Sequence, residues 1–167
     1  IMDILFERKS CRSYVSAPIP QQDLDYILHA AMSSPSAMNT RPWHFIVIKD
    51  KETHSKIMQI HRASQMLANA PLGIIVCCDI EKQYKNYWQQ DCAASTQNIL
   101  LAATAKGYGS VWCGIYPIED RVKAFAELMN LPENIKPFSL VVIGKKAEEP
   151  KEKQRWEPEK IRYEKWQ

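Results

Sequence analysis

An unbroken apolar run, LGIIVCCD at residues 72–79, limits most strongly what this chain can fold into. Its length and composition predict a strand, and both faces of that strand are apolar. Such a strand is buried on both sides, which requires helices on both faces of a sheet. The run is far too short to cross a membrane as a helix, so no membrane partner is expected.

The other elements follow from apolar spacing and turn residues. Helices are predicted over residues 22–32, 51–68, 89–106 and 118–129, after a short first helix capped by Asp3. Strands are predicted over 44–50 and 138–144, and an extended segment over 110–117. The longest helix carries one small-residue face suited to close packing, formed by Ala93, Ala94, Gln97, Leu100, Leu101 and Ala105. These elements predict an α+β sandwich of helices on a small mixed sheet.

The chain has 167 residues, of which 46% are apolar and 25% charged. These values are typical of one folded domain with a hydrophobic core, here residues 1–167. The composition changes from Lys145 onward, where the sequence KKAEEPKEKQRWEPEKIRYEKW is charged and interrupted by prolines and aromatic residues. This tail has no core of its own, so residues 150–167 are expected to pack on a partner surface.

Several function classes are disfavoured. The formal charge of +3 is spread among mixed charges, which is unlike the concentrated basic face of a nucleic-acid-binding protein. Five cysteines form no CxxC pair and share no ligand spacing with the histidines, so no metal site is expected. Their odd number favours reduced thiols in a cytoplasmic protein. No catalytic acid–base or nucleophile set is marked, which suits a reaction carried by a bound cofactor.

Two segments could bind a ligand, although each also has an ordinary structural interpretation. RKSCR at residues 8–12 is either a solvated surface run or a site where arginines and a serine converge on a phosphate. PSAMN at residues 35–39, followed by Arg41, is either a turn entering a strand or a loop that lets a flat ligand approach.

Two further segments have the same ambiguity. GYGSVWCG at residues 107–114 matches neither GxGxxG nor a P-loop and is typical of a tight turn into a strand. Near Gly114, however, backbone N–H groups could face a ligand without obstruction by a side chain. KEKQR at residues 151–155 is a solvated charge run unless a tail that crosses another subunit brings Lys153 and Arg155 to the same anion as Arg8.

Taken in order, RKSCR, PSAMNTRPWHFIVI, the Ala-rich helix with GYGSVWCG, a strand ending in IG and a tail containing KQR resemble the FMN-dependent nitroreductase family. The chain resembles a short member along nearly its whole length. The resemblance implies a nitroreductase-like homodimer with an exchanged C-terminal tail and an FMN in each of two interfacial sites. It also implies a ping-pong reaction in which NADH or NADPH passes hydride through flavin N5 to nitroaromatics, quinones or similar small acceptors.

The resemblance assigns roles to individual residues. Arg8, Lys9, Ser10 and Arg12 would bind FMN, with Arg8 and Ser10 nearer the phosphate and Arg12 near the pyrimidine side of the ring. Lys153 and Arg155 would close on the phosphate. Trp112, Cys113 and Gly114 would lie along the ring, and a partner subunit would supply Pro35, Ser36, Ala37 and Asn39. No essential protein nucleophile is expected, because the reacting atom is flavin N5.

The sequence departs from the family pattern at two of these positions. Lys9 stands where a second arginine is frequent, and Arg41 stands where glutamine usually precedes the Pro-Trp pair. Arg41 could narrow the acceptor pocket or favour an anionic substrate. Two alternatives therefore stay open: a family member with another reductive or flavin-processing reaction, and a flavin-binding module without turnover. Neither NADH nor NADPH is favoured, because no 2′-phosphate motif is visible.

Overall fold

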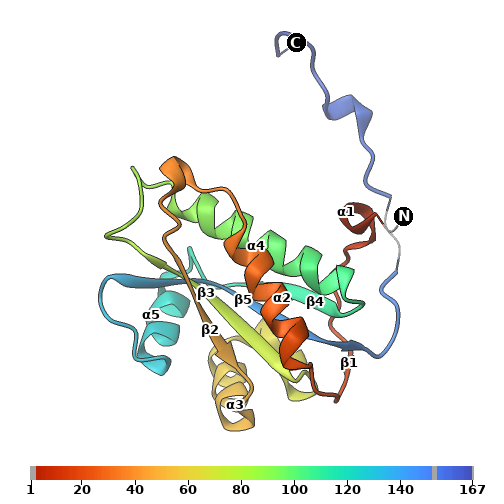
Figure 1. Cartoon of the computed structure of the whole chain (residues 1–167), viewed down its shortest axis with the longest axis vertical. Helices are drawn as coiled ribbons and strands as arrows, with labels where there is room; N and C mark the ends of the chain where they lie inside the picture. Colours follow the sequence, from red (N-terminus) through yellow and green to blue (C-terminus); the bar gives the residue numbers. More distant parts are fainter. Residues whose placement is uncertain (1–2, 152–153, 167) are drawn as a thin grey trace.

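A sheet covered by helices on both faces forms the body of the protein (Figure 1). The computed structural model describes residues 3–151 and 154–166. Its helices are α1 (Ile4–Glu7), α2 (Gln21–Met32), α3 (Lys51–Ile60), α4 (Trp88–Ala105) and α5 (Glu119–Leu128). Its strands are β1 (Tyr14–Val15), β2 (Trp43–Ile48), β3 (Leu72–Asp79), β4 (Gly109–Gly114) and β5 (Ile135–Lys146). Three 3-10 helices are η1 (Ala37–Asn39), η2 (Arg62–Ala68) and η3 (Pro158–Lys160).

The strand pairings correct the expectation of a mixed sheet. The order is β1-β5-β3-β2, with β4 also paired to β5, and each of these pairings is antiparallel. Among the described residues, parallel pairing is confined to the isolated bridge between Ser10 and Ser110. The sheet is therefore antiparallel throughout its strands.

A break in the predicted helix over residues 51–68 explains one of these pairings. The helix α3 begins at its cap Asp50, which accepts a hydrogen bond from the Thr53 N–H at 2.7 Å, and it ends at Ile60. His61 is extended, with φ −134° and ψ 98°, and η2 then packs back on α3. Because the chain doubles back there, it returns to the sheet at the end where β2 left it. A continuous helix of 18 residues would have crossed about 27 Å, toward the opposite end of the sheet.

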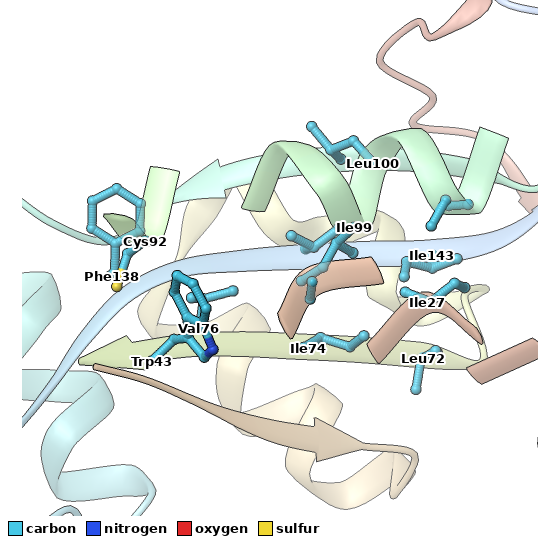
Figure 2. Close-up of a cluster of buried hydrophobic side chains, with 14 of the residues drawn as sticks. Ile27, Trp43, Leu72, Ile74, Val76, Cys92, Ile99, Leu100, Phe138 and Ile143 are labelled. Carbon is cyan, nitrogen blue, oxygen red and sulfur yellow. The ribbon is translucent and has the colours of Figure 1, made fainter. Parts of the chain in front are cut away.

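The strand β3 is buried along its whole length, which confirms that helices cover both of its faces. Its side chains alternate between two cores. Ile74 and Val76 point into the core beneath α2 and α4, which also contains Ile99 of α4 (Figure 2). Ile75 and Cys77 point into the second core, which includes Phe125 of α5.

The small-residue face predicted on α4 is not the face that packs on the sheet. The buried positions of α4 include Cys92, Ser95, Thr96, Ile99 and Ala103. Of the six residues predicted for the small face, Leu100 is buried and the other five are partly exposed. A stripe of small side chains along the longest helix is thus left without full cover in the single chain.

The C-terminal tail leaves the body next to α1 and extends away from the sheet (Figure 1). Its aromatic side chains are exposed, with Trp156 at 70%, Tyr163 at 79% and Trp166 at 85%. These values agree with the expectation that the tail has no core within its own chain. In residues 3–151 and 154–166, no helix is long and apolar enough to cross a membrane.

Candidate functional site

RKSCR runs directly against the first residues of β4. Helix α1 ends at Glu7 with Arg8 as its C-cap, and the Cys11 N–H donates to the Ser110 carbonyl oxygen at 2.9 Å. Cys11 is buried, in agreement with a packing role. A Cβ added at Gly109 would lie 2.7 Å from Cys11 Sγ, so glycine is required for this close approach. The other side chains of the segment are consequently held at one end of β4.

Predicted cationic residues line two adjoining cavities. A cavity of about 470 Å³ is lined by Lys9, Ser10, Arg12 and the tail residue Arg155, together with Lys151 and one acid, Glu148. A smaller cavity of about 290 Å³ is lined by Arg8, Lys9, Arg155 and the apolar residues Leu5, Phe6 and Trp156. Arginines and a serine hydroxyl around one space form a donor set that matches a phosphate. Lys153 lies outside the described residues.

Beyond Ser110, β4 has a free edge. The Ser110 carbonyl points away from β5 toward Cys11, and backbone groups of a strand alternate in direction. The N–H groups of Trp112 and Gly114 therefore also point away from β5. No other strand in residues 3–151 and 154–166 pairs with this part of β4. The free edge begins at RKSCR and continues to Gly114.

The three residues predicted along the flavin ring differ in their placement. The Trp112 side chain is 36% exposed, and its ring meets Phe138 edge-on with centroids 5.8 Å apart. A Cβ at Gly114 would have nothing within 4 Å, so open space adjoins this residue. Cys113 instead points into the second core, where burial raises the pKa of its thiol to about 11. Trp112 and Gly114 can therefore face a ligand, whereas the Cys113 side chain cannot.

The loop with PSAMN is held by a residue that the sequence did not single out. The Ala37 N–H donates to Asp91 Oδ1 at 2.9 Å, and the Arg41 N–H donates to Ser36 Oγ at 3.0 Å. Met38, Asn39 and Arg41 all have positive φ, between 46° and 54°. Asp91 is buried in the first turn of α4. Acidic residues are common in the first turn of a helix, so the sequence gives no signal that Asp91 holds this loop.

The two halves of the predicted site lie at opposite ends of α4. The PSAMN loop contacts its first turn through Asp91, whereas RKSCR meets β4 just after its last turn. An α-helix of 18 residues is about 27 Å long. Figure 1 shows the same separation, with α1 at one end of α4 and the loop that follows α2 at the other. One chain thus brings RKSCR, Arg155, Trp112 and Gly114 together, but not Pro35, Ser36, Ala37, Asn39 and Arg41.

Two further residues at this edge were missed by sequence reasoning. The Gly114 carbonyl oxygen accepts hydrogen bonds from His61 Nε2 at 2.8 Å and from Arg121 Nη1 at 3.1 Å. His61 is 1% exposed, and its Nδ1 has no partner among the described residues. Neither residue belongs to a recognisable motif. Each reaches Gly114 only because a separate element packs there in the fold, so no sequence signal could have found these contacts.

Comparison with known proteins shows the family to which the chain belongs. The sequence model of the Nitroreductase family matches residues 5–89 and 58–145. A Methanothermobacter thermautotrophicus protein named "Putative NADH dehydrogenase/NAD(P)H nitroreductase" is 42% identical over 167 residues, covering 99% of this chain and 87% of the relative. The crystal structure of a protein of the same name from Parabacteroides distasonis superimposes with a TM-score of 0.95 at 31% identity, covering 98% and 97% of the two chains. The chain belongs to the nitroreductase family.

Other relatives carry names that mention a flavin. An FMN-dependent nitroreductase of solved structure from Clostridium difficile R20291 is 28% identical, has a TM-score of 0.91 and covers 99% of this chain and 100% of its own. The FMN reductase [NAD(P)H] of Bacillus subtilis is 25% identical over 180 residues, covering 98% of this chain and 72% of the relative. The nitroreductase fold expected from the motifs is thereby confirmed.

Proposed function

We propose that this protein is an FMN-dependent NAD(P)H oxidoreductase that reduces small acceptors such as nitroaromatics or quinones. The observation that carries the proposal is the row of cations and serine at one end of a free strand edge. The family relatives support it, because an NAD(P)H nitroreductase and an FMN reductase are among those that match most of the chain. The chain is an oxidoreductase of this family, and FMN is its cofactor.

The residues around the two cavities fit the phosphate of FMN. A phosphate monoester carries close to two negative charges at neutral pH, so more than one cation is needed to hold it. Arg8 and Arg155 present planar forks of donors, and Ser10 adds a hydroxyl. The buried Ser110 Oγ next to Ser10 has no partner among the described residues, which leaves one further polar atom at this end of the edge.

The free edge of β4 fits the flat ring system. FMN, when bound, supplies two-electron hydride chemistry at its N5 atom. Gly114 leaves room for a ring to approach the backbone, and its N–H faces the edge and can donate to N5. Arg12, at the other end of the edge, would stabilise negative charge on the pyrimidine side of the ring.

A complete site in this proposal needs a second copy of the chain. The PSAMN residues lie too far from RKSCR in one chain, so the partner subunit would bring its own copy of the loop to the ring. The partly exposed small-residue face of α4 and the exposed Leu5, Phe6 and Met38 leave apolar surface for such a contact. The exposed aromatic residues of the tail would pack on the partner. A cytoplasmic location belongs to the same proposal, because all five cysteines are free thiols.

Arg41 is the residue of the loop that bears on substrate choice. It is exposed and has a φ of 46°. In the assembled dimer it would border the acceptor pocket, where a guanidinium favours acceptors that carry a carboxylate or another anion. The replacement Arg41→Gln should therefore lower the preference for an anionic over a neutral nitroaromatic.

One experiment tests the reaction. The purified protein is loaded with FMN and treated with NADH or NADPH without oxygen, and the flavin absorbance is followed before and after a nitroaromatic or quinone is added. Bleaching followed by recovery supports the proposal. Bleaching without recovery favours a different reductive reaction, and no bleaching favours a flavin-binding module. A protein that FMN does not reconstitute would refute the proposal.

A further inference from the structure

The carbonyl group of Gly114 is held by two side chains from different elements. His61, between α3 and η2, and Arg121, in α5, place Nε2 and Nη1 at 2.8 Å and 3.1 Å from the same oxygen. Because a carbonyl oxygen only accepts, the His61 ring carries its hydrogen on Nε2. One of the two donors is charged, and charge-assisted hydrogen bonds are the stronger kind. The end of β4 is thus clamped from the side of the second core.

The backbone of His61 and one edge of its ring are held by neighbouring groups. Its N–H donates to the Ile57 carbonyl at 2.9 Å, and its own carbonyl accepts from the N–H and Oγ of Ser64 at 3.1 Å and 2.7 Å. The ring meets Phe125 edge-on, with centroids 6.0 Å apart. A donor whose backbone and ring are both immobilised is preorganised, because little freedom is left to lose when a ligand binds.

Gly114 needs such a clamp because glycine has the greatest backbone freedom of all residues. On its C-terminal side, the Ile115 N–H donates to the Phe138 carbonyl at 3.2 Å. With the Gly114 carbonyl also held by His61 and Arg121, the rotation of this residue is restricted. The Gly114 N–H itself belongs to the preceding peptide unit, which the pairing of β4 with β5 directs at the free edge. The clamp adds to this by fixing the Cα atom that the two peptide units share.

We propose that His61 and Arg121 are positioning residues that keep the Gly114 N–H aimed at flavin N5 and thereby lower the reduction potential of bound FMN. The proposal rests on FMN lying along β4, as proposed above. N5 of the oxidised ring accepts a hydrogen bond, whereas N5 of the two-electron-reduced ring carries a hydrogen and cannot accept in the same way. A firmly held N–H therefore favours oxidised FMN and lowers the reduction potential. The cation Arg12 would have the opposite effect, because it stabilises the negative charge of reduced FMN.

The test compares FMN binding and potential in variants of the full chain. In His61→Leu the donor is lost, and the ratio of the dissociation constants of oxidised and reduced FMN should rise about tenfold. For a two-electron couple this corresponds to a potential about 30 mV more positive. His61→Gln, whose side-chain amide places a donor near the position of Nε2, should restore at least half of the shift.

His54, in the helix α3 that precedes His61, provides a matched control. It is also 1% exposed, its Nε2 lies 3.0 Å from the Ile48 carbonyl oxygen, and its Nδ1 likewise has no partner among the described residues. Ile48 belongs to β2, which does not pair with β4. His54→Leu should therefore lower the melting temperature of the protein without moving the potential of bound FMN.

The outcomes separate the two proposals. If wild-type protein binds no FMN, the proposed function fails, whereas normal binding with an unchanged potential in His61→Leu overturns only the positioning role. Equal shifts in His54→Leu and His61→Leu would also overturn it, because they would reflect general loosening. If His61→Leu does not fold, Arg121→Leu is measured instead, since Arg121 is only partly buried. A positive shift in that variant supports the clamp, and an unchanged potential overturns it.

Discussion

The side chain of Asp91 in α4 accepts a hydrogen bond from the backbone N–H of Ala37 at 2.9 Å, which ties the longest helix to the PSAMN loop. Asp91 is buried, and its second carboxylate oxygen has no partner among the described residues. Burying a carboxylate costs stability unless hydrogen bonds or an opposite charge compensate the loss of water. The position of the PSAMN loop, which is proposed to contact the flavin ring, therefore depends on the side chain of Asp91.

Replacing Asp91 should loosen that loop. In Asp91→Ala the partly buried Ala37 N–H loses its acceptor. A fully buried unpaired donor costs about 1–3 kcal/mol, so the cost here should lie toward the lower end of that range. We expect weaker FMN binding together with a lower melting temperature. Asp91→Asn, which keeps an acceptor oxygen and removes the charge, serves as the control and should bind FMN more tightly than Asp91→Ala. Equal FMN affinity in Asp91→Ala and wild type would show that the loop does not contact the ring.

Gly114→Ala should separate folding from cofactor binding. The added methyl group meets nothing within 4 Å in the single chain, so the free energy of unfolding should change by no more than about 0.5 kcal/mol. The same methyl group would enter the space proposed for the flavin ring, so FMN affinity should fall at least tenfold. Titration with FMN, followed by fluorescence quenching, measures this loss.

Gly109→Ala is the matched comparison at the other end of β4. Its methyl group would lie 2.7 Å from both Cys11 Sγ and Lys146 Cγ, so something must shift. Here the unfolding temperature should fall first, because overpacking typically costs about 1–3 kcal/mol. If Gly114→Ala lowers stability as much as Gly109→Ala and leaves FMN affinity intact, the ring does not lie at Gly114.

Arg8→Ala tests the phosphate contact. The loss of one charge-assisted hydrogen bond of about 2 kcal/mol weakens FMN binding about 30-fold. Riboflavin, which has no phosphate, should bind wild type and variant alike. Arg62→Ala is the control, because Arg62 is exposed on η2 and lines neither cationic cavity. Unchanged FMN affinity in Arg8→Ala would mean that RKSCR is a solvated surface segment.

Removal of the tail should change assembly more than folding. Trp156, Tyr163 and Trp166 are largely exposed in the single chain, so a chain ending at residue 150 loses little of its own core. We expect its molecular mass in solution, measured by light scattering after size exclusion, to shift from dimer toward monomer. FMN affinity should fall as well, since Arg155 is lost. A tail-deleted chain that remains a fully FMN-loaded dimer would contradict tail exchange.

Acid stability should depend on Asp23. Tyr108 Oη donates to Asp23 Oδ2 at 2.6 Å, and Lys106 Nζ lies 3.3 Å from Oδ1. The Tyr108 hydrogen bond, aided by Lys106, lowers the pKa of the Asp23 carboxyl below its ordinary value of 3.8. A lowered pKa gives stability that is present above pH 3.8 and is lost as the pH falls toward the folded-state pKa. Tyr108→Phe should therefore flatten the acid limb of a urea-unfolding pH series below about pH 4, whereas an unchanged limb would show that this pair does not contribute.

Much of the architecture could be predicted because it depends on local patterns. Helix α2 was placed within one residue by the spacing of Leu24, Ile27 and Ala31, and all three are buried. The cap at Asp3 and the turn at Gly107, whose φ is 82°, were also recognisable from residue type. The cations of RKSCR were recognisable as candidate phosphate ligands because the residue type alone shows that they carry positive charge.

The features that the sequence could not decide depend on contacts between distant segments. The face of α4 that packs on the sheet could not be chosen from its sequence, because small residues occur on several sides of that helix. Cys113 was expected to lie along the ring, and only the tertiary structure shows that strand alternation turns its side chain into the second core. Asp91 and His61 could not be found at all, since their partners are 54 and 53 residues away in the chain.

The sequence by itself determined that β3 would be buried on both faces, because no alternation of polar residues gives it an exposed side. It also determined that cations would gather near the start of the chain. Only the tertiary structure decided the antiparallel pairing of β2 with β3, through the break at His61, and the free edge of β4 with its clamped end at Gly114. The reason is physical: burial and propensity act on neighbouring residues, whereas the direction of a returning chain is set by hydrogen bonds and packing between elements far apart in sequence.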